Sequence, residues 1–127
     1  MPNGEPEGGE LISRPVFGLL MIAQENIILR RFARPMLFEC DAAINLMDGL
    51  RNILRRKNPI EFARVKSTYR SLDGHLTALR QQMSFARQLN LPDIAQAGIE
   101  CEQWVLAQRR KLRDWWTEHA PDQGPIE

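Results

Sequence analysis

Residues that build metal sites and disulfides are scarce in this sequence. The chain of 127 residues contains two cysteines and two histidines, and these four residues lie far apart. A zinc site needs clustered Cys and His, and a di-iron site in a helical bundle needs a Glu three residues before each His. Neither His75 nor His119 has such a Glu. We therefore expect no metal and no cofactor, and we expect Cys40 and Cys101 to be buried free thiols.

The sequence also lacks long apolar runs and phosphate-binding glycine loops. Its apolar stretch from Val16 to Ala23 is far shorter than the roughly 20 residues that cross a bilayer. The first ten residues hold the only glycine cluster together with three Glu, and a secretory signal would begin with basic residues instead. Anions would be repelled there, so nucleotide hydrolysis has no support. We expect a cytoplasmic protein without membrane contact or a small-molecule substrate.

The residues that are abundant favour helices. Leu, Ala, Arg, Gln, Glu and Met outnumber the β-branched residues, and the chain has only one Tyr. A hydrophobic content of 43% suffices for one core. We expect an all-α protein with a disordered acidic tail over residues 1–10, a helical bundle over residues 11–120 and a C-terminal tail over residues 121–127.

Proline positions divide the bundle into four periodic segments, because Pro fits the first turn of a helix and disfavours helical geometry in the residue before it. The segments run over about residues 14–33, 35–57, 58–89 and 92–119. Asn58, Pro59 and Glu61 resemble a capping box at the start of the third helix. We keep that helix whole across Gly74, since a helical Gly costs only about 1 kcal/mol.

Short connections and four-three apolar spacings predict an up-down-up-down four-helix bundle. The alternative is that the junction at Arg34 and Pro35 bends one continuous path instead of reversing it. The nearly all-round apolar first segment suggests a central helix or an interface. The residues expected to be buried are Leu50, Leu54, Phe62, Val65, Leu72, Leu79 and Trp104.

Charge is divided unevenly under this topology, although the net charge of the chain is only +1. Cations near helix C-termini complement the helix dipole, but this does not explain Arg64, Lys66 and Arg70 early in the third helix. Alternating helices would bring the basic residues to one pole with a net charge of +7, where Arg14 and Lys111 join the candidate surface for an anionic partner. That surface comprises Arg51, Arg55, Arg56, Lys57, Arg64, Lys66, Arg70, Arg109, Arg110 and Arg113.

Tryptophans near this pole offer a second kind of contact. Trp115 and Trp116 are adjacent and point about 100° apart on a helix, so both are buried only on a wide face. We expect Trp116 to be partly exposed and to act as an apolar anchor or a base-stacking platform.

Arg70 and His75, separated by four residues, resemble the Arg-x4-6-His element of the HEPN ribonucleases, which are also helical bundles. The resemblance implies that the two side chains would polarise and protonate an RNA phosphate, usually across a homodimer. This sequence has Ser71 where the family prefers an amide or acid, and it places Gly74 inside the motif.

The expected function is therefore a non-enzymatic interaction module that docks onto a partner protein, forms a homo-oligomer or serves as a small subunit of an assembly. The alternative is an accessory protein that binds a nucleic-acid backbone through its basic pole. A HEPN-like ribonuclease is the remote alternative.

Overall fold

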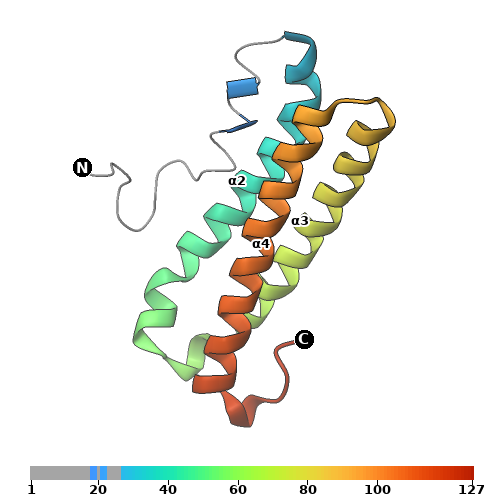
Figure 1. The fold of residues 1–127 in the computed structure, drawn as a ribbon. Helices are drawn as coiled ribbons and strands as arrows, with labels where there is room; N and C mark the ends of the chain where they lie inside the picture. The colour runs from blue at the N-terminus through green and yellow to red at the C-terminus, as the bar shows by residue number, and fades with distance from the viewer. Residues whose placement is uncertain (1–17, 20, 23–26) are drawn as a thin grey trace, which may run out of the picture.

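The computed structural model describes residues 18, 19, 21, 22 and 27–127, and these residues are almost entirely helical (Figure 1). Within this described part of the chain there are three long helices: α2 (Ile27–Arg56), α3 (Phe62–Gln88) and α4 (Pro92–His119). Short 3-10 helices precede α3 and follow α4, namely η1 (Pro59–Glu61) and η2 (Pro121–Gln123). The described part of the chain contains no strand, so the all-α expectation is confirmed.

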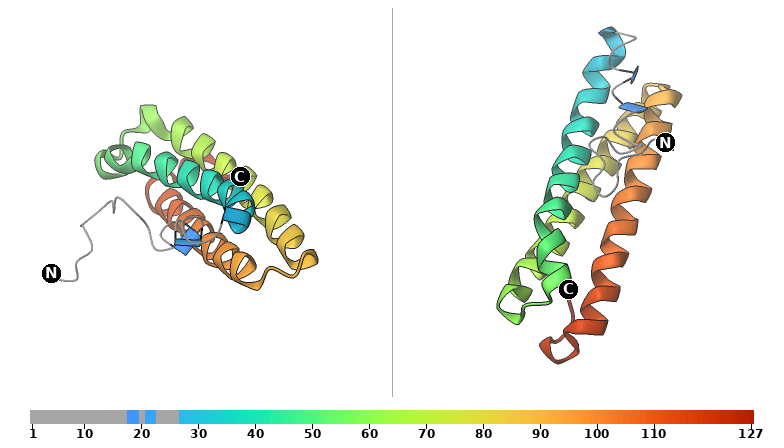
Figure 2. Two further views of the ribbon diagram at one scale, coloured as in Figure 1. Left: turned by 90° about the horizontal axis from the view of Figure 1, so that it is seen from above. Right: turned by 90° about the vertical axis from the view of Figure 1, so that its left-hand side faces the viewer.

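The three helices run side by side and alternate in direction (Figures 1 and 2). Each of them contacts the other two. Because α2 and α4 point the same way, the end of α2, the start of α3 and the end of α4 meet at one end of the bundle, at the bottom of Figure 1. The start of α2, the end of α3 and the start of α4 lie toward the other end.

The expected reversal at Arg34 and Pro35 does not occur, because α2 continues through both residues. Proline removes one helical hydrogen bond, here the one to the carbonyl of Arg31. Arg31, Arg34 and Pro35 are all exposed, so this carbonyl lies on the solvent side of α2. On its inner side Ala33, Met36 and Cys40 are fully buried, and this packing holds the helix together across the proline.

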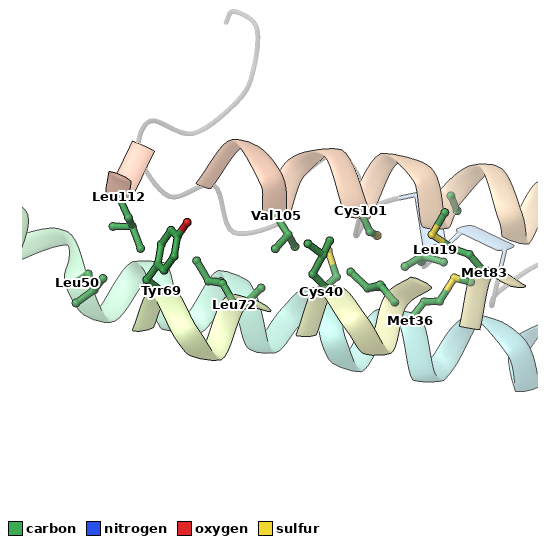
Figure 3. Packing of buried hydrophobic residues seen from close by; sticks show 14 of the residues in the cluster. Leu19, Met36, Cys40, Leu50, Tyr69, Leu72, Met83, Cys101, Val105 and Leu112 are labelled. Carbon is green, nitrogen blue, oxygen red and sulfur yellow. The ribbon is translucent and has the colours of Figure 1, made fainter. Parts of the chain in front are cut away.

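A fourth long helix is consequently not confirmed. Of the segment expected over residues 14–33, the structure describes four helical residues before α2, and Leu19 among them is fully buried. Figure 3 shows Leu19 in the part of the core that contains Met36, Met83 and Cys101. The acidic tail over residues 1–10 and Arg14 lie outside the described residues.

The third helix is unbroken, as the sequence predicts, but its start differs from the expected capping box. Asn58 caps the 3-10 helix η1, α3 itself begins at Phe62, and Glu61 Oε2 has no hydrogen-bond partner among the described residues. Asn58 Oδ1 accepts a hydrogen bond from the Ile60 amide at 3.1 Å, and α3 runs unbroken through Gly74. Lys57 and Asn90 follow α2 and α3 in left-handed conformations, with φ of 57° and 58°. No side chain caps α4, which begins at Pro92 after Leu91.

The core lies between the three helices and confirms most of the expected buried residues (Figure 3). Every apolar position of the four-three pattern in α3 is buried, from Phe62 to Ala86. Leu50 is also fully buried. Leu54 and Trp104 are only partly buried at the margin of the core, which corrects two expectations.

Gly98 lies where α4 packs closely against Met36 of α2 and Met83 of α3. A Cβ at this position would lie 2.4 Å from Met83 Cγ and 3.2 Å from Met36 Cε. A methyl group would therefore force Met83 to move in a close-packed region. Gly74 is the opposite case, since a Cβ there would meet nothing within 4 Å.

This contrast predicts opposite effects of two identical substitutions. Gly98→Ala should lower the free energy of unfolding by about 1 kcal/mol or more, because overpacking outweighs the helix propensity of Ala. Gly74→Ala should raise it by up to about 1 kcal/mol through propensity alone. Urea titrations of both variants measure the difference, and equal effects would show that α4 does not pack this closely on Met83.

Candidate anion-binding surface

Basic residues from three helices gather at one end of the bundle, which we call the basic end. It comprises the last turns of α2, the connection to α3, the first half of α3, and the second half of α4 with the segment that follows it (Figure 1). Its cations are Arg51, Arg55, Arg56, Lys57, Arg64, Lys66, Arg70, Arg109, Arg110, Lys111 and Arg113. The fold thus brings together every described residue of the surface expected from the sequence.

The charge of the basic end is smaller than the +7 expected. Asp73, assigned from the sequence to the other pole, lies 3.8 Å from Arg109, measured from its Oδ1 to Nη2. The segment after α4 adds Asp122 and Glu127, since it packs back onto this end of the bundle. Eleven basic side chains therefore face seven acidic ones among the described residues, a net charge of +4.

Few of these cations are neutralised by ion pairs. Arg51 pairs with Asp48 at 3.1 Å and Arg56 with Glu61 at 3.6 Å, and both arginine side chains are about half exposed or more. Exposed pairs of this kind contribute only about 0 to 1 kcal/mol. The cations that make no ion pair with another described residue are Arg55, Lys57, Arg64, Lys66, Arg70, Arg110, Lys111 and Arg113.

Tyr69 organises the face of the basic end between α3 and α4. Its ring is 1% exposed, and two guanidinium groups from α4 lie against it. The Cζ atoms of Arg109 and Arg113 are 4.4 and 5.9 Å from the ring centroid. Arg113 Nη2 also donates a hydrogen bond to Tyr69 Oη at 2.6 Å, and this bond raises the pKa of the Arg113 guanidinium above its usual value. The ring thus fixes two cations one helical turn apart.

Arg109 has fewer of its hydrogen-bond donors satisfied than Arg113. Its side chain is 16% exposed, and its Nε is buried without a hydrogen-bond partner among the described residues. The separation of 3.8 Å from Asp73 is too long for a hydrogen bond. The guanidinium therefore keeps donors that the described residues do not use.

The expectation that Trp116 is exposed is wrong. The side chain is 5% exposed, and its Nε1 donates to the Gly124 carbonyl at 2.7 Å. The cause is the segment expected to be a tail, which turns back through η2 and buries Ile126. Trp115 is partly buried, and its Nε1 donates to the Leu54 carbonyl at 3.0 Å. Neither indole is free to act as a stacking platform.

Arg70 and His75 do not converge on one site. His75 Nδ1 lies 2.6 Å from Glu39 Oε1 of α2, so this side chain faces the α2 side of α3. Arg70 precedes it by five residues, which places it about 140° away around the helix axis. Arg70 is exposed and makes no ion pair with a described residue.

Other chemistry has little support in the described residues. Cys40 and Cys101 are buried free thiols, as expected, and the hydrogen bond between them together with burial raises the pKa of Cys101. A thiol held protonated is a poor nucleophile. No group of three or more His, Cys, Asp or Glu in the described ranges is placed to hold a metal ion. None of the helices described is long and apolar enough to span a membrane.

Comparisons with known proteins give no further guide. No protein-family model matches the sequence, and neither the curated proteins nor the solved structures searched contain a match.

The packing of the C-terminal segment over Trp116 predicts the effect of a substitution that detaches this segment. Ile126→Asp should release the segment, because a carboxylate replaces an apolar group that is 4% exposed, and stability should fall by about 1 to 3 kcal/mol. Acrylamide quenching of tryptophan fluorescence should increase as Trp116 becomes accessible. Gln123→Ala, an exposed change in the same segment, is the control. Unchanged quenching would show that other residues cover the indole.

Proposed function

We propose that this protein is a non-enzymatic interaction module and that the basic end is its binding surface for an anionic partner. The observation that carries the proposal is the meeting of cations from three helices with too few acidic partners. Such a surface creates a local potential that attracts anions and accelerates their association. The partner therefore carries several negative charges.

Helix stability accounts for only part of this arrangement. Cations in the last turns of α2 and α4 interact favourably with the helix dipoles, by about 0.3 to 1 kcal/mol each. Arg64, Lys66 and Arg70 lie in the first third of α3, where the dipole disfavours positive charge. Binding of an anion would explain the position of these three cations, which helix stability does not explain.

The expected apolar docking surface has weaker support. Trp116 is buried, and most of the first predicted segment lies outside the described residues. Large apolar side chains that are exposed include Phe38 at 69% and Phe85 at 54%, and these belong to the first half of α2 and the last turn of α3. Homo-oligomerisation and docking onto an apolar protein surface thus remain the second proposal, with these residues as its anchors.

Charge reversal at the basic end tests the proposed function. The triple variant Arg55→Glu, Arg56→Glu and Arg110→Glu should weaken binding to polyanionic probes by at least about tenfold at moderate salt. Fluorescence anisotropy with a labelled mixed-sequence DNA duplex, a single strand and a poly-glutamate peptide measures it. Binding by the unaltered protein should weaken as salt rises.

A matched control separates local from overall charge. Arg31→Glu, Arg34→Glu and Arg87→Glu change the net charge equally, but these exposed residues belong to the first half of α2 and the end of α3. This control should bind nearly as well as the unaltered protein, because salt screens charges beyond about 10 Å. Equal losses in both triple variants, or no binding to any probe, would refute the proposed surface.

Absence of ribonuclease activity is a separate expectation. The protein should cleave single-stranded RNA no faster than buffer, and His75→Ala should change nothing, because His75 faces Glu39 and not Arg70. A gel assay with a labelled RNA measures cleavage, and Thr77→Ala on an exposed part of α3 is the control. Cleavage that disappears only in His75→Ala would establish the HEPN-like alternative.

A further inference from the structure

We propose that the anionic partner is the phosphate backbone of a nucleic-acid duplex, and that Arg109 and Arg113, held on Tyr69, are its phosphate-contacting pair. This inference rests on the proposed function and assigns the chemistry of its partner. It concerns the face of the basic end between α3 and α4.

The two arginines are held in place before any partner binds. Long side chains lose rotamer freedom when they bind, and that loss reduces affinity. Here the ring of Tyr69 already orders both guanidinium groups, through contacts at 4.4 and 5.9 Å and a hydrogen bond at 2.6 Å. An ordered guanidinium presents its remaining donors as a planar fork, which matches two oxygens of one phosphate.

The charge around this pair is predominantly positive. Lys66 and Arg70 lie three residues before and one residue after Tyr69 on α3, and neither forms an ion pair with another described residue. Asp73, whose side chain is 62% exposed, forms an ion pair with Arg109 at 3.8 Å but no hydrogen bond. The charges of Asp114 and Glu127 also act on Arg113, which forms an ion pair with neither of them. Two helices therefore flank Tyr69 with four cations, of which only Arg109 forms an ion pair with a described residue, and this excess of positive charge suits a row of phosphates.

The scarcity of exposed apolar side chains at the basic end favours a nucleic-acid backbone over an acidic protein as the partner. Protein interfaces depend on aromatic or aliphatic anchors that become buried on binding. Of the large apolar side chains exposed in the described residues, only Ile60 belongs to the basic end, and it is 87% exposed. Trp115 and Trp116 are held by internal hydrogen bonds, so stacking on unpaired bases is not available either. Phosphate contacts without base stacking are the contacts that a duplex offers.

The test measures duplex affinity as a function of salt for conservative variants. Arg113→Lys keeps the charge but loses the fork, and Tyr69→Phe keeps the ring but loses the hydrogen bond that orders Arg113. Each should weaken binding by about three- to tenfold with little change in the salt slope. Arg113→Gln should also lower the magnitude of that slope by about one. Arg87→Lys, near the end of α3, is the control and should leave affinity and slope unchanged.

Stability must be followed in parallel, because Tyr69 is buried. Arg113 is exposed, so its two variants should keep the melting temperature and the helical circular dichroism of the unaltered protein. They therefore test the inference even if Tyr69→Phe unfolds.

The outcomes separate this inference from the function on which it rests. If duplex binding is weakened by the charge reversal of Arg55, Arg56 and Arg110 but is unchanged in both Arg113 variants, the phosphate-contacting pair is refuted. The proposal that the basic end binds anions is then retained. If poly-glutamate binds and the duplex does not, the partner is an acidic protein and the inference fails alone. If no polyanion binds, both proposals fail.

Discussion

The direction of α2 relative to α4 is the constraint on which the rest of this structure depends. Two short connections set it, and each uses a non-glycine residue in the left-handed region, Lys57 after α2 and Asn90 after α3. Such a residue ends a helix and turns the chain at a modest energetic cost, which Asn tolerates better than most residues. Two reversals leave α2 and α4 pointing the same way, so the arginine-rich ends of both helices meet.

This meeting concentrates like charges, and the fold compensates for them in several ways. The C-terminal dipoles of two helices stabilise nearby cations, and exposed ion pairs with Asp48 and Glu61 add little more. Tyr69 contributes through its ring, because cation–π contacts lower the energy of guanidinium groups packed closely together. Binding of an anion, as proposed, would relieve the remaining repulsion and would link the packing of α3 on α4 to the proposed function.

How far the sequence predicts this arrangement depends on the range of the contacts involved. The course of α3 and the start of η1 after Asn58 follow from local signals, namely a cap and an uninterrupted apolar spacing. The common end of α2 and α4 follows from short connections. The continuity of α2 does not follow from local signals. The burial of Ala33 and Met36 against other helices outweighs the tendency of Pro35 to interrupt a helix. Leu54 and Trp104 fit the same spacing but lie at the edge of a core formed by three described helices.

At the candidate site, too, local features are predictable from the sequence and long-range contacts are not. The basic residues themselves were predictable, whereas their organisation around Tyr69 was not, since Tyr69 and Arg113 are 44 residues apart. The four-residue spacing of Arg109 and Arg113 was the only local signal of a paired arrangement. Trp116 was misjudged because the covering Ile126 follows two prolines in a segment with tail-like composition.

The central claim is that one end of this bundle binds polyanions, and a residue-resolved map of the contact tests it most directly. Amide chemical shifts recorded during titration of the isotope-labelled protein with a DNA duplex would provide that map. The account predicts that shifts concentrate in the last turns of α2, the first half of α3 and the second half of α4, with Tyr69, Arg109 and Arg113 among the largest. Shifts confined to the start of α2 and the end of α3, or spread evenly over the surface, would contradict it.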